Sequence, residues 1–571
     1  MSARSSRFDL PGFSLPLDYN IENHRQRFPN ALDPHFDEEL SGRYDTYREI
    51  VMRQITNTVI EKPDWNRKVF NEEITAKWRQ EIAASGRDVS SNMMDWIIKE
   101  LRWKAGYLAE SGMIPVFDTG VVISDTAIPP ELQQELQRAV APLEMLKKDY
   151  HPGSDKKVVD LVHPSLFPVI YGRSRILPDT FMGLDDCLGH AGEGQLLPTP
   201  TTTLSKPDRW GSDLAHLRIF SQKFQWMPCD VEFAEEDGSC RIVSYINNLH
   251  PKKYRPLYGV IERIITRTIP LWNNTLSNCE TERRRMDWWN AEYVPESPGS
   301  SYSDWERDRQ LVQPEPGEFE PKVVTPEDTI NLRKQFPSGL QVIVKLANIE
   351  LIPENPTYDG GSWHVEGALN EHICATAIYY YESVNITASD SLAFRQRAPP
   401  HAINDMPYEQ HDHRFLQEIF GFPEHVTGYG PTQVTQEIGS IRTKQGRLLT
   451  FPNTLQHRVS PFELADKSKP GCRKILALFL VDPHFRIISS ANIPPQREDW
   501  WEEKQEAIFS EGVLARLPVE LQDMVLQHVD VGHVTFDEAC QYRLELMEER
   551  RVRAREDNEA FETGDFGLCE H

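Results

Sequence analysis

The residues best suited to chemistry in this sequence are a histidine and a glutamate placed two positions apart. His364 and Glu366 lie in the segment GGSWHVEG, residues 360–367, just after a turn rich in Pro and Gly. Successive side chains of an extended segment alternate between its two faces, so these two side chains point the same way. One imidazole and one carboxylate are therefore directed at a common point from a single strand end.

A third metal ligand has to come from another part of the chain. The segment FPNTLQHRVSPF supplies His457, which is 457 − 366 = 91 residues further on and lies beside another predicted strand. Two histidines and one carboxylate on one face of an octahedron form the facial triad of non-haem iron(II) enzymes, in which other positions stay open. No thiolate joins the set, which disfavours a structural zinc site. The His-x-Glu tripeptide alone is common on protein surfaces, so its glycine-rich and strand-rich context carries this prediction.

A cation after the distal histidine suggests how a carboxylate could be held. Arg473 opens the predicted strand GCRKILALFLV, 473 − 457 = 16 residues beyond His457. A guanidinium presents a planar fork that matches a carboxylate with two hydrogen bonds. Lys474 is the neighbouring alternative but alternates to the other face of the strand. A surface arginine at a strand start remains the competing interpretation.

The elements that must position these residues change in character along the chain. Helical periodicity is found at 44–60, 73–84, 93–110, 131–146 and 258–272, and again at 517–529 and 535–558. Short alternating strands separated by turn residues are predicted at 340–352, 372–381, 391–394, 446–451 and 474–481, a pattern typical of a barrel or jelly roll. We therefore predict an α+β protein with a mostly helical region 1–320, a β domain 321–495 and a helical extension 496–571.

Composition narrows the classes of partner. The 62 Lys and Arg residues against 87 Asp and Glu give a formal net charge of −25, which disfavours general binding to nucleic acid or to an anionic membrane. The chain shows no apolar stretch long enough to span a bilayer and no apolar core of a secretory signal. The eight cysteines are scattered without a CxxC pair, as expected for reduced thiols in the cytoplasm or nucleus. We expect a protein that is not secreted and that has neither nucleic-acid nor membrane partners.

Several motifs resemble those of a known family. WHVEG-x-x-NEHI-x-AT-x-x-YYY, SLAFR and GRLLTFPN-x-x-QHRV are similar to motifs of a fungal family of unknown function, which in turn resembles the Fe(II)/2-oxoglutarate-dependent dioxygenases. SYINNLHP and LPVELQDMV extend the likeness over most of the chain. The resemblance implies a double-stranded β-helix core (cupin or jelly-roll-like), Fe(II) held by His364, Glu366 and His457, and 2-oxoglutarate with its far carboxylate on Arg473. One departure is Glu366, since most such enzymes have Asp at this position.

Four more residues near the triad have possible roles. The strand after the first two ligands carries Thr376 and Tyr379, at positions where dioxygenases often place hydrogen bonds to 2-oxoglutarate, although packing explains them equally well. Asn370 and Glu371 are candidates for orienting the metal ligands, and a simple turn is their alternative.

These observations predict an iron- and 2-oxoglutarate-dependent dioxygenase that uses dioxygen to oxidise a C–H bond, most simply by hydroxylation. A small metabolite and a protein side chain are both compatible as substrates. Two alternatives stay open: a non-catalytic cupin-like scaffold, and a metal-dependent oxygenase without 2-oxoglutarate, which would not need Arg473.

Overall fold

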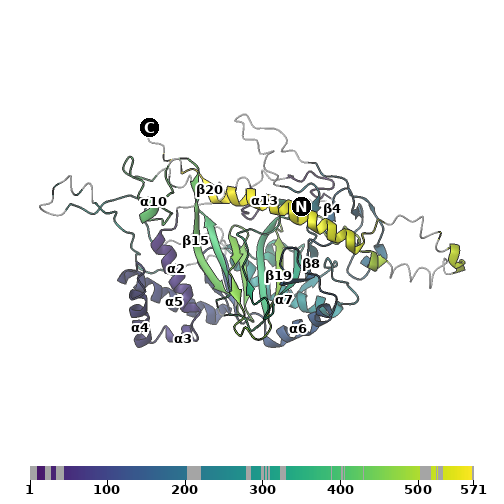
Figure 1. The fold of residues 1–571 in the computed structure, drawn as a ribbon, viewed down its shortest axis with the longest axis horizontal. Coiled ribbons are helices and arrows are strands. Elements are labelled where there is room, and N and C mark those ends of the chain that lie inside the picture. The colour runs from purple at the N-terminus through teal and green to yellow at the C-terminus, as the bar shows by residue number, and fades with distance from the viewer. Residues whose placement is uncertain are drawn as a thin grey trace.

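The computed structural model describes residues 9–19, 27–33, 36, 44–201, 220–277, 285–296, 301, 305, 309–321, 329–387, 389–399, 403, 406–428, 430–501, 516–521, 524, 532–566 and 568. These residues form a mixed α and β structure built around a large antiparallel sheet (Figure 1). The predicted combination of helices with an antiparallel sheet is confirmed at this level.

The large sheet contains nine strands in the order β1-β2-β16-β12-β19-β10-β8-β9, with β3 also paired to β10. Its centre consists of three long strands, β10 (Leu340–Leu351), β19 (Gly471–Val481) and β12 (Ile373–Val384). Their side chains are buried on both faces over most of their length. The other strands are β1 (Ile114–Val116), β2 (Val121–Ser124), β3 (Val158–Val162), β8 (Cys229–Phe233), β9 (Cys240–Ile242) and β16 (Leu448–Pro452).

A smaller set of strands packs against the large sheet. Strands β15 (Thr435–Arg442), β13 (Ser391–Arg397) and β17 (Gln456–Val459) form one three-stranded sheet, and β11 (Thr357–Tyr358) pairs with β18 (Phe462–Glu463) beside it. Phe394 of the small sheet meets Phe451 of the large sheet with ring centroids 5.2 Å apart. The two sheets therefore share an apolar interior.

Alternation along β10 decides which side chains enter that interior. Val342, Val344 and Leu346 join the core formed with helices α6 (Pro130–Glu144) and α7 (Arg255–Ser277), whereas Ile343 joins the core that holds Phe394. The period of two is a property of any strand and it divides the two cores here. Helix α7 supplies a long apolar face, with Ile261, Ile264, Ile265 and Trp272 all fully buried, and so it covers the outer face of the sheet.

Four N-terminal helices gather at the opposite end of the sheet from α6 and α7 (Figure 1). They are α2 (Tyr47–Ile60), α3 (Trp65–Lys68), α4 (Glu72–Ala83) and α5 (Ser91–Ser111). Three of them begin at a side chain that accepts a hydrogen bond from the first turn, Thr46, Asn71 and Ser90, which satisfies backbone donors that a helix start leaves free. Asn57 of α2 then donates from Nδ2 to the Ser440 carbonyl of β15 at 2.8 Å.

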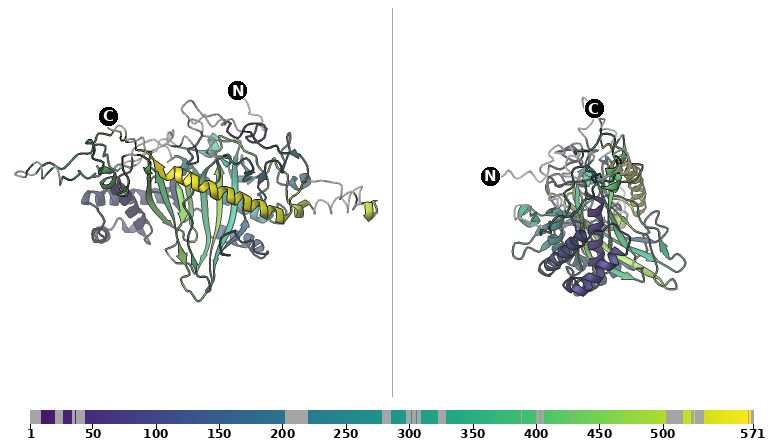
Figure 2. Two further views of the ribbon diagram at one scale, coloured as in Figure 1. Left: turned by 45° about the horizontal axis from the view of Figure 1, so that its top comes forward. Right: turned by 90° about the vertical axis from the view of Figure 1, so that its left-hand side faces the viewer.

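The C-terminal helix α13 (Phe536–Glu562) crosses the strand ends, as Figures 1 and 2 show from two sides. It begins with a capping box between Thr535 and Glu538. Arg543 pairs with Asp149 at 2.6 Å and Arg550 pairs with Glu371 at 2.7 Å. These buried or half-buried ion pairs fasten the helix to the body of the protein at two points.

The predicted helices and strands appear where the periodicity placed them, except that helix 517–529 falls largely outside the described residues. Two strands of the small sheet, β15 and β17, were not predicted. The predicted boundary at residue 320 does not separate two sheets, because β1, β2, β3, β8 and β9 come from before it and pair with later strands. The sequence indicates short strands within 158–235 and at 242–245, but each observed strand has only three to five residues, too few for the sequence to show which strands it pairs with.

Within the described residues, no helix is both long enough and apolar enough to cross a membrane.

The packing of α7 on the sheet predicts a specific cost for a cavity. Ile264 is 0 % exposed, so Ile264→Ala should lower the free energy of unfolding by about 2–5 kcal/mol through lost burial and an unfilled void. Urea denaturation followed by tryptophan fluorescence measures this loss. The control is Val552→Ala on α13, where the side chain is 41 % exposed and the change should stay within about 0.5 kcal/mol. Equal losses in both variants would contradict the assignment of α7 to the core.

Candidate metal centre

His364 and His457 face each other across an antiparallel bridge between two strand ends. The amide of His364 donates to the carbonyl of His457 at 3.1 Å, and the amide of His457 donates back at 2.9 Å. The ring centroids are 4.4 Å apart. Two histidines that are 457 − 364 = 93 residues apart in the chain are thus held together by backbone hydrogen bonds.

Strand alternation brings Glu366 to the same point. Its Oε1 lies 3.3 Å from Nε2 of His457, and one ligand atom from each of the three residues lies within 4.8 Å of the others. His457 is buried, and the other two are half-buried. The structure therefore brings together the three residues that the sequence predicts as metal ligands.

Hydrogen bonds prepare two of these ligands for a metal. Nδ1 of His364 lies 2.8 Å from the Ser362 carbonyl. A carbonyl can only accept, so Nδ1 carries the proton and the lone pair of Nε2 is left for a cation. Asn453 holds the glutamate strand: its Oδ1 accepts from the Glu366 amide at 3.0 Å, and its Nδ2 donates to the Glu366 carbonyl at 3.1 Å.

The protonation states also suit a divalent cation. Burial, together with the neighbouring His457, lowers the pKa of His364 to about 4. Burial raises the pKa of Glu366, but the hydrogen bond and the charge interaction with His457 outweigh it and bring that pKa to about 2. At neutral pH His364 is therefore neutral and Glu366 is ionised, as metal ligation requires.

Helix α13 fastens the two ligand strands to each other. Nδ2 of Asn558 donates to the Trp363 carbonyl at 2.9 Å, and Oδ1 of Asn558 accepts from Gln456 at 2.7 Å. Trp363 and Gln456 are the residues directly before His364 and His457. The guanidinium groups of Arg395 and Arg458 lie 4.8 Å and 4.3 Å from the Trp363 ring, so cations also fix that side chain.

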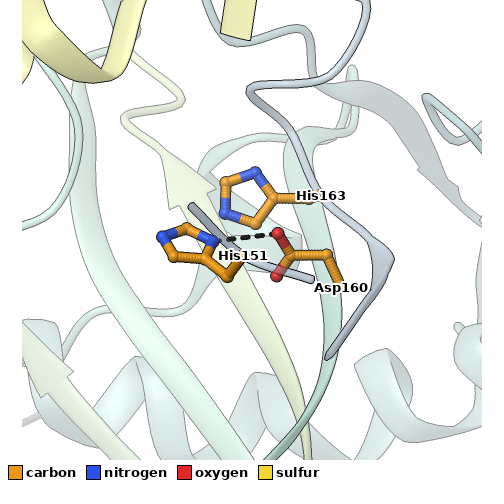
Figure 3. Close-up of side chains that lie close together, drawn as sticks. All are labelled: His151, Asp160 and His163. Carbon is orange, nitrogen blue, oxygen red and sulfur yellow. Dashed lines mark hydrogen bonds and ion pairs between the residues drawn. The ribbon is translucent and has the colours of Figure 1, made fainter. Parts of the chain in front are cut away.

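The described residues contain a second histidine and carboxylate cluster, His151, Asp160 and His163 (Figure 3). Nδ1 of His151 lies 2.8 Å from Asp160. The Ser165 amide donates to Nδ1 of His163 at 3.1 Å, which leaves the proton of the neutral ring on its other nitrogen, so neither nitrogen offers a free lone pair. Arg543 also lies 3.8 Å from Asp160. We therefore treat this cluster as a hydrogen-bonded network and the His364 cluster as the candidate metal centre.

Arg473 lies well away from the triad. It forms a short buried ion pair with Asp390, and its guanidinium packs over the Phe462 ring at 4.6 Å. Asp390 precedes Phe394 by four residues, and Phe394 is paired with His457, which corresponds to about 13 Å along the strand. Lys474, the alternative cation, faces the other side and pairs with Glu144 at 3.0 Å. Neither of the two predicted cations reaches the three metal ligands.

The other predicted contacts divide between two faces. Thr376 is paired with Phe451 and Phe479, both in the interior core. Tyr379 lies on the opposite face, in the core formed with α7. Glu371 accepts from Arg550 and from the Trp226 amide, and it anchors α13 rather than a metal ligand. Asn370 bonds the Phe224 carbonyl at 3.0 Å, also away from the triad.

Three residues near the centre were not singled out from the sequence. Asn453 and Asn558 act on the ligand strands through backbone groups, and nothing in their local sequence signals this. Lys345 is different, because it is a lone charge inside the apolar strand LQVIVKLANIEL. A lysine in such a strand is a recognisable signal, since buried ammonium groups are uncommon.

Removing any one ligand should abolish tight metal binding. His364→Ala, Glu366→Ala and His457→Ala should each weaken Mn(II) or anaerobic Fe(II) binding by at least about 100-fold, because each supplies one of three protein donors. Equilibrium dialysis with metal analysis gives the affinities. His151→Ala and His163→Gln provide matched controls at the second cluster and should leave binding unchanged. Loss of metal in the control variants alone would move the site to that cluster.

The protonation of His364 gives a second test. A folded-state pKa of about 4 lies below the ordinary value for histidine, so the imidazole stays neutral as pH falls through 6.5 and gains its proton only near pH 4. Folding then disfavours the protonated form, and this residue makes the protein less stable as pH falls from about 6.5 to 4. NMR of the metal-free protein with labelled histidine measures the midpoint, using His364→Ala to assign the signal. A midpoint near 6.5 would contradict the desolvated site.

Comparisons with known proteins extend these observations. Among solved structures, the Fe(II)/α-ketoglutarate-dependent dioxygenase TqaL matches with 10% sequence identity and a TM-score of 0.27, covering 69% of this chain and 91% of that one. No curated protein matches the chain. Residues 91–504 match the family described as "Protein of unknown function (DUF4246)", and residues 10–81 match the N-terminal domain of the same family. The chain belongs to the DUF4246 family.

Proposed function

We propose that this protein is an Fe(II)- and 2-oxoglutarate-dependent oxygenase that oxidises a C–H bond of a small metabolite or of a protein side chain. The observation that carries the proposal is the convergence of His364, Glu366 and His457 on one point from two bridged strands, with the Nε2 lone pair of His364 left free. Two imidazoles and one carboxylate are the donor set preferred by non-haem iron(II) sites with open positions.

The arrangement of the strands supports a double-stranded β-helix. β16, β12, β19 and β10 are neighbours in the large sheet, and β15, β13 and β17 are neighbours in the small one, with the β11–His364 segment beside β17. Four central strands of the nine-stranded sheet, and the three-stranded sheet with the β11–His364 segment, would supply the two layers of that architecture. The metal ligands lie on the small sheet, where the two sheets enclose the apolar interior.

The chain's own residues have defined tasks in this proposal. His364 and His457 would donate neutral nitrogen lone pairs, and Glu366 would neutralise one charge of the cation. The Phe451 ring lies 4.7 Å from the His457 ring and keeps water from that side of the ligand. When bound, iron with 2-oxoglutarate supplies the activation of dioxygen, coupled to conversion of the 2-oxo acid into succinate and CO2.

A second function, a metal-dependent oxygenase that does not use 2-oxoglutarate, has one observation in its favour. Arg473, the cation expected from the sequence to hold the far carboxylate, is already paired with Asp390. A 2-oxoglutarate carboxylate at Arg473 would have to lie beside the Asp390 carboxylate, and this like-charge contact disfavours that way of holding 2-oxoglutarate.

Anaerobic titration with Fe(II) and then with 2-oxoglutarate distinguishes these functions. The proposal predicts a visible charge-transfer band when 2-oxoglutarate is added to the iron-loaded protein, and loss of this band in His364→Ala because iron is no longer held. Admission of oxygen should then yield succinate even without the oxidised substrate. The His151→Ala variant serves as the control and should keep the band. A metal-loaded, folded protein that gives neither band nor succinate would exclude 2-oxoglutarate as co-substrate.

A further inference from the structure

We infer that Lys345, on the first long strand of the β domain, binds the far carboxylate of the 2-oxo acid that chelates the metal. This assignment rests on the proposed function and names the cation that the proposed site lacks. It differs from the expectation for Arg473, which lies deeper in the interior and is already paired. Three features of the structure support the assignment. They are the face of β10 on which Lys345 lies, its position along β10 relative to the metal ligands, and its lack of an ion-pair partner among the described residues.

The alternation of side chains along β10 shows which face of the sheet Lys345 lies on. Lys345 is flanked by Val344 and Leu346, which both point to α7. Two residues earlier, Ile343 lies in the interior core. Lys345 shares its face by strand alternation, and its neighbour on β19 is Ala477, also of the interior core. The small alanine side chain leaves room beside the lysine stem.

The position along the strand places Lys345 near the metal ligands. Phe451, which contacts His457, is paired with Thr376, and Thr376 is paired with Phe479. Phe479 is in turn paired with Ile343. Lys345 is two residues beyond this level, about 7 Å along the strand.

Arg473 is paired with Ile349, six residues beyond Ile343 and about 20 Å along the strand. The far carboxylate of 2-oxoglutarate is separated from its keto carbon by only two methylene groups. A co-substrate anchored at the metal ligands therefore reaches the level of Lys345 and stops well short of Arg473. The positive charge of Lys345 is among those that lower the pKa of Glu366 and of His364, and it also lowers the pKa of Asp160 and of His163, so the ammonium lies within electrostatic range of both clusters.

Lys345 and Arg473 differ in whether their charges are already paired with a carboxylate. No hydrogen bond or ion pair joins Lys345 to any residue that the structure describes, and its side chain is half-buried. Asp160 is the carboxylate closest in register, since it is paired with Ala347. Its Oδ2 bonds His151 at 2.8 Å, and the charge of Lys345 helps to lower the pKa of Asp160 without forming an ion pair with it. Arg473 differs in that its Nη1 already donates to Asp390, so an incoming carboxylate would have to share the guanidinium with that buried carboxylate. A half-buried ammonium without a partner suits an incoming carboxylate.

The same chemistry could come from a carboxylate on the oxidised substrate, so the test compares two co-substrates that differ only in that group. Calorimetry under nitrogen on the Fe(II)-loaded protein would measure the affinity for 2-oxoglutarate and for 2-oxopentanoate, which lacks the far carboxylate. The wild type should prefer 2-oxoglutarate by about 10- to 100-fold, the contribution of a charge-assisted hydrogen bond. Lys345→Met should remove this preference while its affinity for 2-oxopentanoate stays within about twofold, and Lys345→Arg should retain most of it.

Two control proteins separate the lysine from the other cations. Lys474→Met removes the same charge from the outer face of the neighbouring strand and should keep the preference. The double variant Arg473→Met with Asp390→Leu removes the buried pair together, so that no lone charge is left behind, and it should also keep the preference. Metal content is measured in every variant so that a lost metal is not read as a lost carboxylate contact.

The outcomes of the inference and of the proposed function can be told apart. A retained preference in Lys345→Met would overturn the assignment and leave a substrate carboxylate as the lysine's partner. Loss of preference in the Arg473 and Asp390 double variant alone would transfer the role to Arg473. If neither 2-oxo acid binds to the metal-loaded wild type, the proposed function itself fails.

Discussion

The paired backbone hydrogen bonds between His364 and His457 join two segments that are 93 residues apart, and the geometry of the candidate metal centre depends on them. Backbone groups inside a protein must find partners, so this bridge is maintained whether or not a metal is present. It also fixes the direction of both imidazoles, because a side chain in a bridge leaves the backbone at a defined angle. Glu366 and Asn453 are then positioned by the same two strands.

Charge around the centre follows a strict pattern of pairing. The chain carries a formal net charge of −25, yet several arginines lie near the ligands, and each has a carboxylate partner, such as Glu371 for Arg550 and Glu562 for Arg395. Buried guanidinium groups without carboxylates would cost several kcal/mol each. Lys345 differs, because no hydrogen bond or ion pair joins its half-buried side chain to any residue that the structure describes.

The long central strands and the pairing of two candidate ligands could be predicted from the sequence for clear physical reasons. The long strands β10, β12 and β19 can be predicted because they are rich in β-branched and alternating residues. The His-x-Glu spacing places two candidate ligands on one face of any extended segment, independently of the rest of the fold. The sequence alone argues against Thr376 and Tyr379 both contacting 2-oxoglutarate. They are three residues apart, and alternation along a strand places them on opposite faces.

The long-range ion pair of Arg473, the pairing of the short strands and the tautomer of His364 could not be predicted from the sequence. The pairing of Arg473 with Asp390 joins residues 473 − 390 = 83 apart, and no local pattern encodes it. The strands β3 and β8 are too short for a period-two pattern, yet their pairing with β10 carries the sheet across the predicted boundary at 320. The hydrogen bond that decides which nitrogen of His364 is free is made to the Ser362 carbonyl and depends on local backbone geometry.

The clamp that Asn558 forms over both ligand strands has a consequence for how the protein is made. The residues that complete the centre, 364, 457 and 558, emerge from the ribosome in that order and roughly a hundred residues apart. The His364 strand can form its bridge only after the His457 strand has been made. The hydrogen bonds from Asn558 to both strands form only when α13 docks. A chain that stalls between residues 457 and 558 would therefore carry all three candidate ligands without the clamp that joins their strands.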